Sequence, residues 1–214
     1  CPILGAKHPQ ALGQRGQEVW AEIWHIIGPM LDGVLHERQA TWSYDQLLPM
    51  DRYGYTEETY FTFSYSPILD ETGAVGGVFT AVTETTGRVI GERRLKTLHD
   101  LGERATAGKT AAEACHIAVE VLAANRLDLP FALLYLLDAA GEQARLISHS
   151  GVEATSTFAP RLITLSHETA GWRLAQVLAD DQPLPIEDLR ARHDPVPARP
   201  WAAAPDNAYM MPSA

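Results

Sequence analysis

The strictest alternation of apolar and polar residues lies in the segment 60–67. Phe61, Phe63 and Tyr65 fall on one face of an extended chain, and the residues between them are Thr and Ser. A period of two is typical of a half-buried strand. A turn with Asp and Gly follows, and then a second β-rich stretch at 77–83. The pattern therefore predicts a β-hairpin.

A charged helix is predicted directly after this hairpin, over residues 84–107. Charges of alternating sign recur every four positions, as on a helix face with i,i+4 ion pairs: Arg88, Glu92, Lys96, Asp100 and Arg104. Apolar residues project from the other side: Ile90, Leu98, Leu101 and Ala105. A sheet whose last strand continues into an amphipathic helix is suited to transmit a change in shape, which favours a sensor over a catalyst.

The hydrophobic positions before the hairpin predict one helix and one strand. Apolar residues spaced three and four apart predict an amphipathic helix over 17–36. Gly28-Pro29 inside it should kink the helix or split it in two. A strand is expected at 41–48, followed by a polar loop at 51–55.

A second set of elements is predicted after Gly108. Thr110 can cap a helix and Glu113 can complete a capping box. One face of that helix would be lined by Ala111, Cys115, Ala118 and Leu122. The helix should end at Asn125, and the apolar run 131–137 has the length of a strand buried on both faces.

The remainder of the chain predicts shorter elements. Strands are expected at 144–148 and 161–165, a helix around 172–178, and a strand at 183–189 that runs into a helical turn. The segment 190–207 is rich in Pro and Ala without a clear period. It is either a long loop or a segment that lacks order without its docking partner.

Composition excludes some classes of function. The 214 residues carry 17 basic and 27 acidic side chains, a net charge of −10, which argues against nonspecific nucleic-acid binding. Cys1 and Cys115 cannot form a disulfide framework, so a cytoplasmic setting is expected. No apolar run has the length of a membrane span. The chain opens within ordered-looking sequence and stops shortly after Met211, so we expect a fragment cut at both ends.

Together these patterns resemble a tandem of PAS and GAF domains. Residues 1–86 resemble a PAS domain without its first strand, and Val82-Thr83-Glu84 keeps the outline of the acidic-Ile-Thr-Glu signature that closes many PAS domains. Residues 87–107 would be the connecting signalling helix. Residues 108–214 resemble a GAF domain without its C-terminal part, through strand 131–137 and the segment from Pro183 to Leu189.

The resemblance implies the sensory half of a bacterial hybrid histidine kinase. The expected fold class is α+β, with two sensory domains that each have an antiparallel sheet flanked by helices. Kinase and receiver domains, or a response regulator, would be partners outside this chain. We expect no catalytic, cofactor-binding or metal-binding residues here, and the small-molecule ligand of the PAS or GAF pocket is unspecified. A homodimer through Leu98, Leu101 and Ala105 is expected.

Two alternatives stay open. The chain can be a dimerisation or docking scaffold with filled cores, or the sensory front of a phosphatase or a cyclic-dinucleotide synthase. The aromatic residues either line a ligand cavity or fill a small core: Trp20, Trp24, Trp42, Phe61, Phe63 and Tyr65. A polar and aromatic cavity would favour the sensor.

Other candidate chemistry has simpler structural interpretations. Gly108-Lys109-Thr110 resembles the end of a P-loop, but position 103 is Glu rather than Gly, so a helix start is preferred. Cys115-His116 is similar to the bilin-holding pair of phytochrome-like GAF domains, but a buried structural thiol is the better interpretation. His25 falls on the polar side of its helix, and His99-Asp100 resembles the start of a phosphoacceptor motif. Solvated turns explain Glu57-Glu58 and Asp180-Asp181 best.

Overall fold

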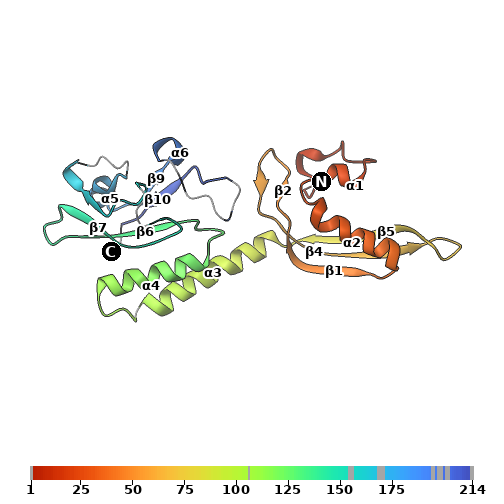
Figure 1. Ribbon diagram of the computed structural model, residues 1–214, viewed down its shortest axis with the longest axis horizontal. Helices are drawn as coiled ribbons and strands as arrows, with labels where there is room; N and C mark the ends of the chain where they lie inside the picture. Colours follow the sequence, from red (N-terminus) through yellow and green to blue (C-terminus); the bar gives the residue numbers. More distant parts are fainter. Residues whose placement is uncertain are drawn as a thin grey trace. The chain divides into compact units, whose positions relative to one another are not determined.

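The computed structural model describes residues 2–105, 107–153, 157–167, 172–193, 196, 200 and 203–212. The chain divides into two compact units, Cys1–Glu92 and Arg93–Ala214. Each unit has a three-stranded antiparallel sheet accompanied by helices (Figure 1), which confirms the α+β class.

The first unit is built on the sheet β1-β4-β5. Its elements are η1 (Gly5–Lys7), α1 (Gly16–Val19), α2 (Trp24–Glu37), β1 (Thr41–Leu47), β2 (Met50–Asp51), β3 (Thr56–Glu57), β4 (Tyr60–Leu69) and β5 (Val75–Glu84). Helix α3 (Thr86–Ala105) begins in this unit and continues into the second. The predicted hairpin, the strand before it and the helix after it are all present.

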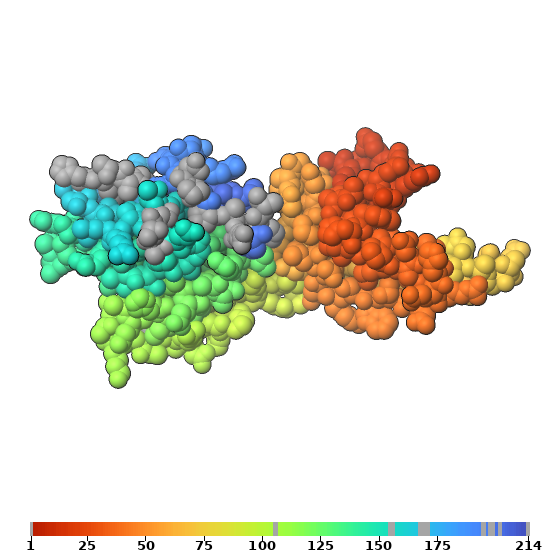
Figure 2. Space-filling view, viewed as in Figure 1, coloured from red at the N-terminus to blue at the C-terminus, as the bar shows by residue number. Residues whose placement is uncertain are grey.

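The β4–β5 hairpin has the alternation that the sequence predicts. Phe61, Phe63 and Tyr65 are buried, and β5 pairs along almost all of β4. The turn is held by Asp70, whose Oδ1 accepts hydrogen bonds from the backbone N–H groups of Thr72 and Ala74. Figure 2 shows the yellow tip of this hairpin projecting beyond the rest of the first unit.

Helix α2 covers one face of this sheet (Figure 1). Ile27 and Val34 pack into the core, and Ile23 joins them from the residue that precedes the helix. The sequence analysis expected Gly28-Pro29 to kink the helix or to split it in two, and the helix is not split there. Pro29 lies inside α2, and the break falls at residues 20–23 between α1 and α2. Because proline has no N–H, the carbonyl of His25 lacks its helical hydrogen bond from position 29. His25 is exposed and lies near the start of the helix, so the helix tolerates this loss.

The outer face of β1 carries aromatic residues that are not core. Trp42 is 65% exposed and Tyr44 is 75% exposed. Both alternate with the half-buried Thr41 and Ser43, so they point away from α2. The expectation that Trp42 belongs to a core or cavity is therefore wrong.

The second unit contains the remainder of α3 and a second sheet, β6-β7-β8, with β9 and β10 forming a separate pair. Its elements are α4 (Ala111–Ala124), β6 (Ala132–Leu137), β7 (Gln143–Ser150), β8 (Leu162–Thr164), η2 (Leu165–His167), α5 (Leu174–Asp180), β9 (Leu184–Ile186), α6 (Leu189–Arg192) and β10 (Ala208–Met210). These bounds agree with the predicted strands and helices to within a few residues. Much of the segment 190–207 lies outside the described residues.

Helix α4 begins at the predicted cap. The hydroxyl of Thr110 accepts a hydrogen bond from the N–H of Glu113, whose carboxylate accepts one from the N–H of Lys109 at 2.8 Å. The predicted buried face is only partly right. Ala111 is exposed, and Val119 and Val121 are the buried residues. Since α4 contacts β6 and β7 on one side and α3 runs alongside it (Figure 1), apolar residues are covered on more than one face.

Strand β6 is less buried than its apolar sequence predicts. It is an edge strand of its sheet, and its side chains are half-buried, with Leu137 43% exposed. Besides the buried residues of α4, a buried cluster of this unit includes Phe158, Trp172 and Leu189. Burial on both faces is typical of parallel strands, whereas this sheet is antiparallel and its strands can be less covered, which explains the difference.

Candidate functional site

A cavity of about 110 Å³ lies between α2 and the sheet of the first unit. Its wall is mostly apolar and comes from the N-terminal segment, α2 and its preceding turn, the loop after β1, and strands β4 and β5: Ile3, Trp20, Ile23, Ile27, Leu48, Met50, Phe61, Phe63, Tyr65, Thr80 and Val82. Four of the predicted aromatic residues line this cavity, namely Trp20, Phe61, Phe63 and Tyr65. Phe61, Phe63 and Tyr65 also belong to the buried core, and Trp20 packs against it.

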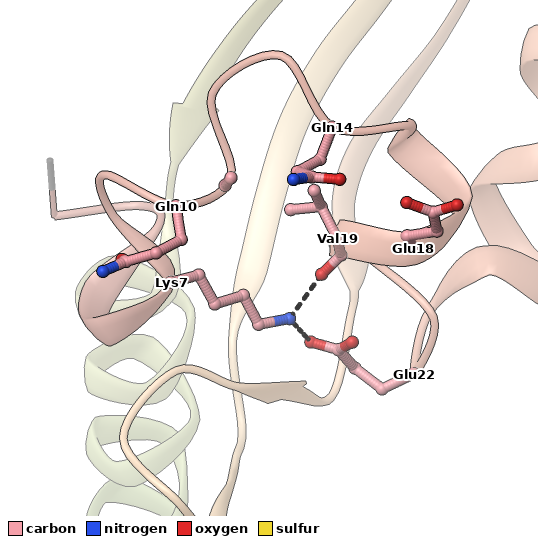
Figure 3. A pocket seen from close by; sticks show the side chains of 7 residues that line it. Lys7, Gln10, Gln14, Glu18, Val19 and Glu22 are labelled. Atoms are coloured by element: carbon pink, nitrogen blue, oxygen red, sulfur yellow. Dashed lines mark hydrogen bonds and ion pairs between the residues drawn. The ribbon is translucent and has the colours of Figure 1, made fainter.

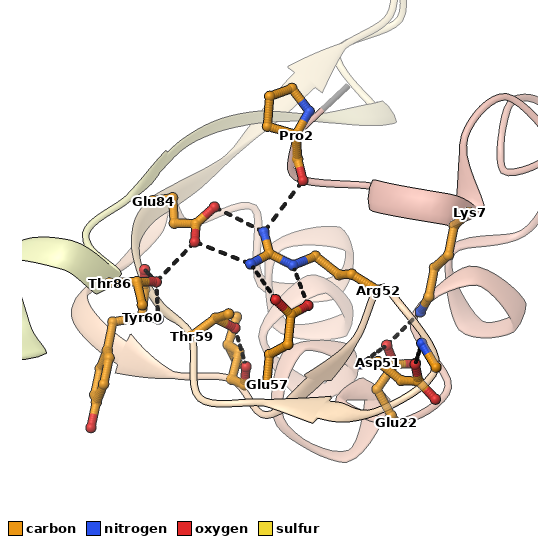
Figure 4. A network of polar contacts seen from close by, with 12 residues as sticks. Pro2, Lys7, Glu22, Asp51, Arg52, Glu57, Thr59, Tyr60, Glu84 and Thr86 are labelled. Atoms are coloured by element: carbon orange, nitrogen blue, oxygen red, sulfur yellow. Dashed lines mark hydrogen bonds and ion pairs between the residues drawn. The ribbon is translucent and has the colours of Figure 1, made fainter. Parts of the chain in front are cut away.

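An ion-pair network lies where β5 ends and α3 begins. The guanidinium of Arg52 lies between the carboxylates of Glu57 and Glu84 (Figure 4). Its Nε donates to Glu57 at 2.8 Å and its Nη1 donates to Glu84 at 2.9 Å and to the carbonyl of Pro2 at 3.3 Å. One side chain therefore connects the β2–β3 ribbon, the end of β5 and the N-terminal segment.

Burial strengthens this network. The Arg52 side chain is 9% exposed, and those of Glu57 and Glu84 are 15% and 28% exposed. The hydrogen bonds to Glu57 raise the pKa of Arg52 further above its ordinary value, outweighing the opposing effect of burial. A bidentate guanidinium–carboxylate pair also fixes orientation, so the network sets the direction in which the chain leaves β5.

A glycine makes room for this arginine. Gly5 has a φ of +54°, and a Cβ atom there would lie 2.7 Å from the Cβ of Arg52. The N–H of Ala6 donates to the carbonyl of Arg52 at 2.9 Å. The N-terminal segment therefore packs directly on the backbone of Arg52, and only glycine permits this approach.

The first turn of α3 is tied to the same network. The hydroxyl of Thr86 donates to Glu84 at 3.0 Å and accepts from the N–H of Tyr60 at 2.9 Å (Figure 4). Two residues later, Arg88 forms an ion pair with Asp45 on β1 and another with Glu92 at 3.0 Å. The start of α3 is thus held to β1, β4 and β5.

A shallow hollow of about 400 Å³ lies on the outside of the N-terminal segment (Figure 3). Lys7 crosses it, donating to the carbonyl of Val19 at 2.7 Å and to the carboxylate of Glu22. The ammonium also lies 4.8 Å from the ring centre of Trp20, which is part of the cavity wall. These contacts hold one wall of the cavity in place.

The second unit has an equivalent anchor for α3. Asp128 accepts two hydrogen bonds of 2.9 Å from Arg93 and further ones from Arg94 and Asn125. Burial opposes ionisation of Asp128, but the hydrogen bonds from Arg93 and Asn125 outweigh it and hold the carboxyl pKa below its ordinary value. Asn125 is itself buried and donates to Thr97 on α3 at 3.0 Å.

The predicted charge stripe on α3 forms only in part. Arg88–Glu92 and Lys96–Asp100 pair along the helix, at 3.0 and 2.7 Å. Arg104 instead pairs with Glu120 of α4, at 2.8 Å. The stripe therefore contributes to the packing of α3 as well as to its solvation.

Other candidate residues have the structural roles that the sequence favoured. The segment 108–110 starts α4 and is not a P-loop. Cys115 is a half-buried free thiol whose pKa is raised by burial. His116 is exposed and lies 3.2 Å from the hydroxyl of Ser148. Asp180 and Asp181 are exposed at the end of α5.

The donor atoms of His99, Asp100 and Glu103 lie within 4.8 Å of one another on α3. His99 and Glu103 are exposed and 3.7 Å apart, and Asp100 accepts a hydrogen bond from Lys96 at 2.7 Å. Ion pairs along the helix surface account for this arrangement.

The sequence analysis missed Arg52 and misjudged Glu57 and Glu58. It placed all three in polar loops, whereas Glu57 pairs with Arg52 and Glu58 accepts a hydrogen bond from the hydroxyl of Tyr60 at 2.9 Å. Arg52 and Glu84 are 32 residues apart, and no period or spacing in the sequence pairs them.

Neither the protein-family models nor the curated proteins compared with this sequence match it. Among the helices within the described ranges, none combines the length and the apolar character that spanning a membrane requires.

Proposed function

We propose that this chain is the sensory and signal-transmission part of a two-component histidine kinase, with a PAS-like unit followed by a GAF-like unit. The PAS-like cavity binds a small molecule, and α3 carries the response onward. The phosphotransfer reaction belongs to kinase and receiver domains or to a response regulator, which are partners of this chain. The support is the sequence resemblance together with the geometry of the first unit.

One observation carries this proposal. β5 lines the cavity through Thr80 and Val82, and it ends two residues later at Glu84, the partner of Arg52. Thr86, which begins α3, donates to the same carboxylate. A ligand that displaces β5 thus acts on the ion pairs that hold the start of α3. The path is short and consists of backbone and buried polar contacts.

The proposal includes a homodimer through α3, with a changed set of contact residues. Leu98 is 65% exposed, and Leu95, which the sequence analysis did not select, is 68% exposed three residues earlier. Leu101 is half-buried, and the side chain of Ala105 lies outside the described residues. Two exposed leucines on adjacent turns form a short apolar seam, which favours a weak, adjustable contact.

The first experiment is native mass spectrometry of the purified chain, compared with the same sample after denaturation. A mass that is lost on unfolding is the expected result. Hydrogen exchange then tests transmission, using Ile27→Phe to fill the cavity in place of a ligand. Slower or faster exchange at residues 84–92 is expected, because β5 and the start of α3 share the Arg52 contacts.

The matched control is Leu35→Phe, on the same helix at a position that is 42% exposed. It should leave exchange at residues 84–92 unchanged. The transmission proposal is wrong if the Ile27 and Leu35 variants both leave this exchange unaltered. Turnover of ATP by the chain alone would contradict the assignment of catalysis to other domains.

A second candidate, a scaffold that binds no ligand, is favoured by the size of the cavity. At about 110 Å³ it is well below the range of about 300–1,000 Å³ that is usual for ligand pockets. A dimer without any retained mass, and with no binding of small molecules, would support the scaffold.

A further inference from the structure

The face of the first sheet that points away from α2 carries exposed aromatic residues on both of its outer strands. Trp42 and Tyr44 lie on β1, and Phe79 on β5 is 59% exposed. The register places Trp42 beside Ser64 of β4, and Phe79 beside Ser66 of the same strand, so these side chains share one face. Three large rings are therefore exposed to solvent on a single face of the sheet.

Small uncharged residues make up most of the rest of this face. The residues that the register places on it are Trp42, Tyr44, Thr62, Ser64, Ser66, Ile68, Gly77, Phe79, Ala81 and Thr83. The charged pair of Asp45 and Arg88 lies at one end, where Asp45 donates its N–H to the hydroxyl of Thr62. Charged residues are depleted at the centre of protein interfaces and common at the rim. The face therefore fits an uncharged, largely apolar partner surface.

The area of this face is sufficient for a weak dimer. An aromatic side chain has about 150–250 Å² of surface, so three that are roughly two-thirds exposed offer about 400 Å² in each copy. Two such faces in contact cover about 800 Å² of aromatic surface, and Ile68 and the hydroxyl residues bring the total above about 1,000 Å². This is the lower limit for a specific interface, so the contact should form reversibly.

The face is also complementary to itself. When a two-fold axis runs between two copies along their strands, β1 of each copy lies opposite β5 of the other. Trp42 shares its row with Ala81 on β5, so it then lies over Ala81 of the second copy. The row of Phe79 passes through Ser66 and meets β1 just before its first residue, next to Ala40. Large side chains thus face small ones, as close packing of two sheets requires.

We propose that this face docks against the same face of a second copy of this chain, with β1 of each copy opposite β5 of the other. The two sheets form a sandwich, and α2 of each copy lies on its outside. This contact is separate from the α3 seam of Leu95 and Leu98 and needs no ligand in the cavity. It therefore stands or falls independently of the proposed sensory function.

Sedimentation velocity of the full chain over a wide range of concentrations measures the dimer, which should grow with concentration. Trp42→Lys should weaken dimerisation at least about tenfold, because it removes an exposed ring from the contact and brings a charge there. Tyr55→Lys is the matched control, since it removes a ring of similar exposure, 61%, from the loop between β2 and β3. It should leave the dimer unchanged. The unfolding temperature of each variant shows that it is folded.

An exchange of large and small residues tests the arrangement of the two sheets. Trp42→Ala and Ala81→Trp should each weaken the dimer, the first through lost contact and the second through a clash of two rings. The two substitutions together should recover much of the affinity, because the ring at position 81 then lies over a small residue at position 42 of the second copy. Lack of any recovery would overturn the arrangement of β1 opposite β5.

The variant Leu98→Glu separates this contact from the α3 seam. Dissociation by Trp42→Lys supports the sheet contact whatever the effect of Leu98→Glu, which tests the seam. A dimer that only Leu98→Glu dissociates would overturn the sheet contact and leave the dimer of the proposed function in place. A chain that stays monomeric at all concentrations, or equal effects of Trp42→Lys and Tyr55→Lys, would also overturn the proposal.

Discussion

Replacement of Arg52 by methionine is the most informative single perturbation of the first unit. Methionine retains most of the apolar stem and removes the guanidinium. The variant leaves the carboxylates of Glu57 and Glu84 close together without their common partner, although their side chains are only 15% and 28% exposed. The carbonyl of Pro2 also loses a donor.

The cost follows from this burial. Removing one partner of a buried ion pair costs about 3–5 kcal/mol, because the remaining charge stays desolvated. Since Glu84 is partly exposed, the lower end applies, and we expect Arg52→Met to lower the free energy of unfolding of the first unit by about 3 kcal/mol. A unit of this size loses at least about 4 °C per kcal/mol, so its midpoint should fall by about 12 °C or more.

Arg88→Met is the matched control. Arg88 also pairs with two carboxylates, but its side chain is 50% exposed, so the same substitution should cost less than about 1 kcal/mol. Urea unfolding followed by tryptophan fluorescence compares the two variants, and Arg52→Met combined with Glu57→Gln should recover part of the loss. Equal costs for the two arginines, or a cost below about 1 kcal/mol at Arg52, would refute the reasoning.

Three further predictions concern the second unit. Gly151→Ala should destabilise it by about 2–4 kcal/mol in urea unfolding, because the new Cβ would lie 2.0 Å from the carbonyl oxygen of Pro130 at a φ of +74°. Gly141→Ala, with a φ of +69° and open space around it, should cost about 1–2 kcal/mol, and a larger cost there would show that backbone strain dominates. Asp128→Ala should cost about 2–3 kcal/mol and speed hydrogen exchange in the second half of α3, because the Arg93 side chain, 18% exposed, loses two hydrogen bonds and stays partly buried. Unchanged hydrogen exchange in α3 would contradict the anchoring role of Asp128. His193 is buried, and burial and the nearby Arg192 lower its pKa from the ordinary 6.5, so the unfolded chain binds a proton that the folded chain does not. Stability should therefore fall as the pH drops below about 6.5, by up to about 1.4 kcal/mol per pH unit, and His193→Gln should remove this dependence in unfolding curves taken from about pH 7.5 to about pH 5.

Structural elements that depend on contacts between residues close in the sequence could be predicted. The β4–β5 hairpin follows from alternation over a few residues, and the start of α4 follows from Thr110 and Glu113, which contact each other across one turn. The bounds of α3 follow from its charge spacing. In each case the interacting groups are separated by a short, regular stretch of chain, so period and spacing suffice.

Features set by tertiary contacts could not be predicted. Arg52 donates a hydrogen bond to Glu84, which lies 32 residues later in the sequence. Nothing in the sequence near either residue indicates that the two will form a buried pair. Alternation also identifies two faces of a strand without saying which one a helix will cover, and Trp42 was misplaced for that reason. The helix break lies at residues 20–23, where Trp20 and Ile23 contact the core, instead of at Pro29, and the sequence does not show these tertiary contacts.

Strand β5 has a consequence for the handling of the protein. It is the last strand of its sheet, and residues 75–83 contain neither a charged residue nor a proline. Natural edge strands usually carry such residues, which prevent the free N–H and C=O groups from pairing with another molecule. The exposed edge of β5 is therefore a point at which concentrated samples should aggregate, and a lysine at Ala81 would make the chain easier to keep in solution.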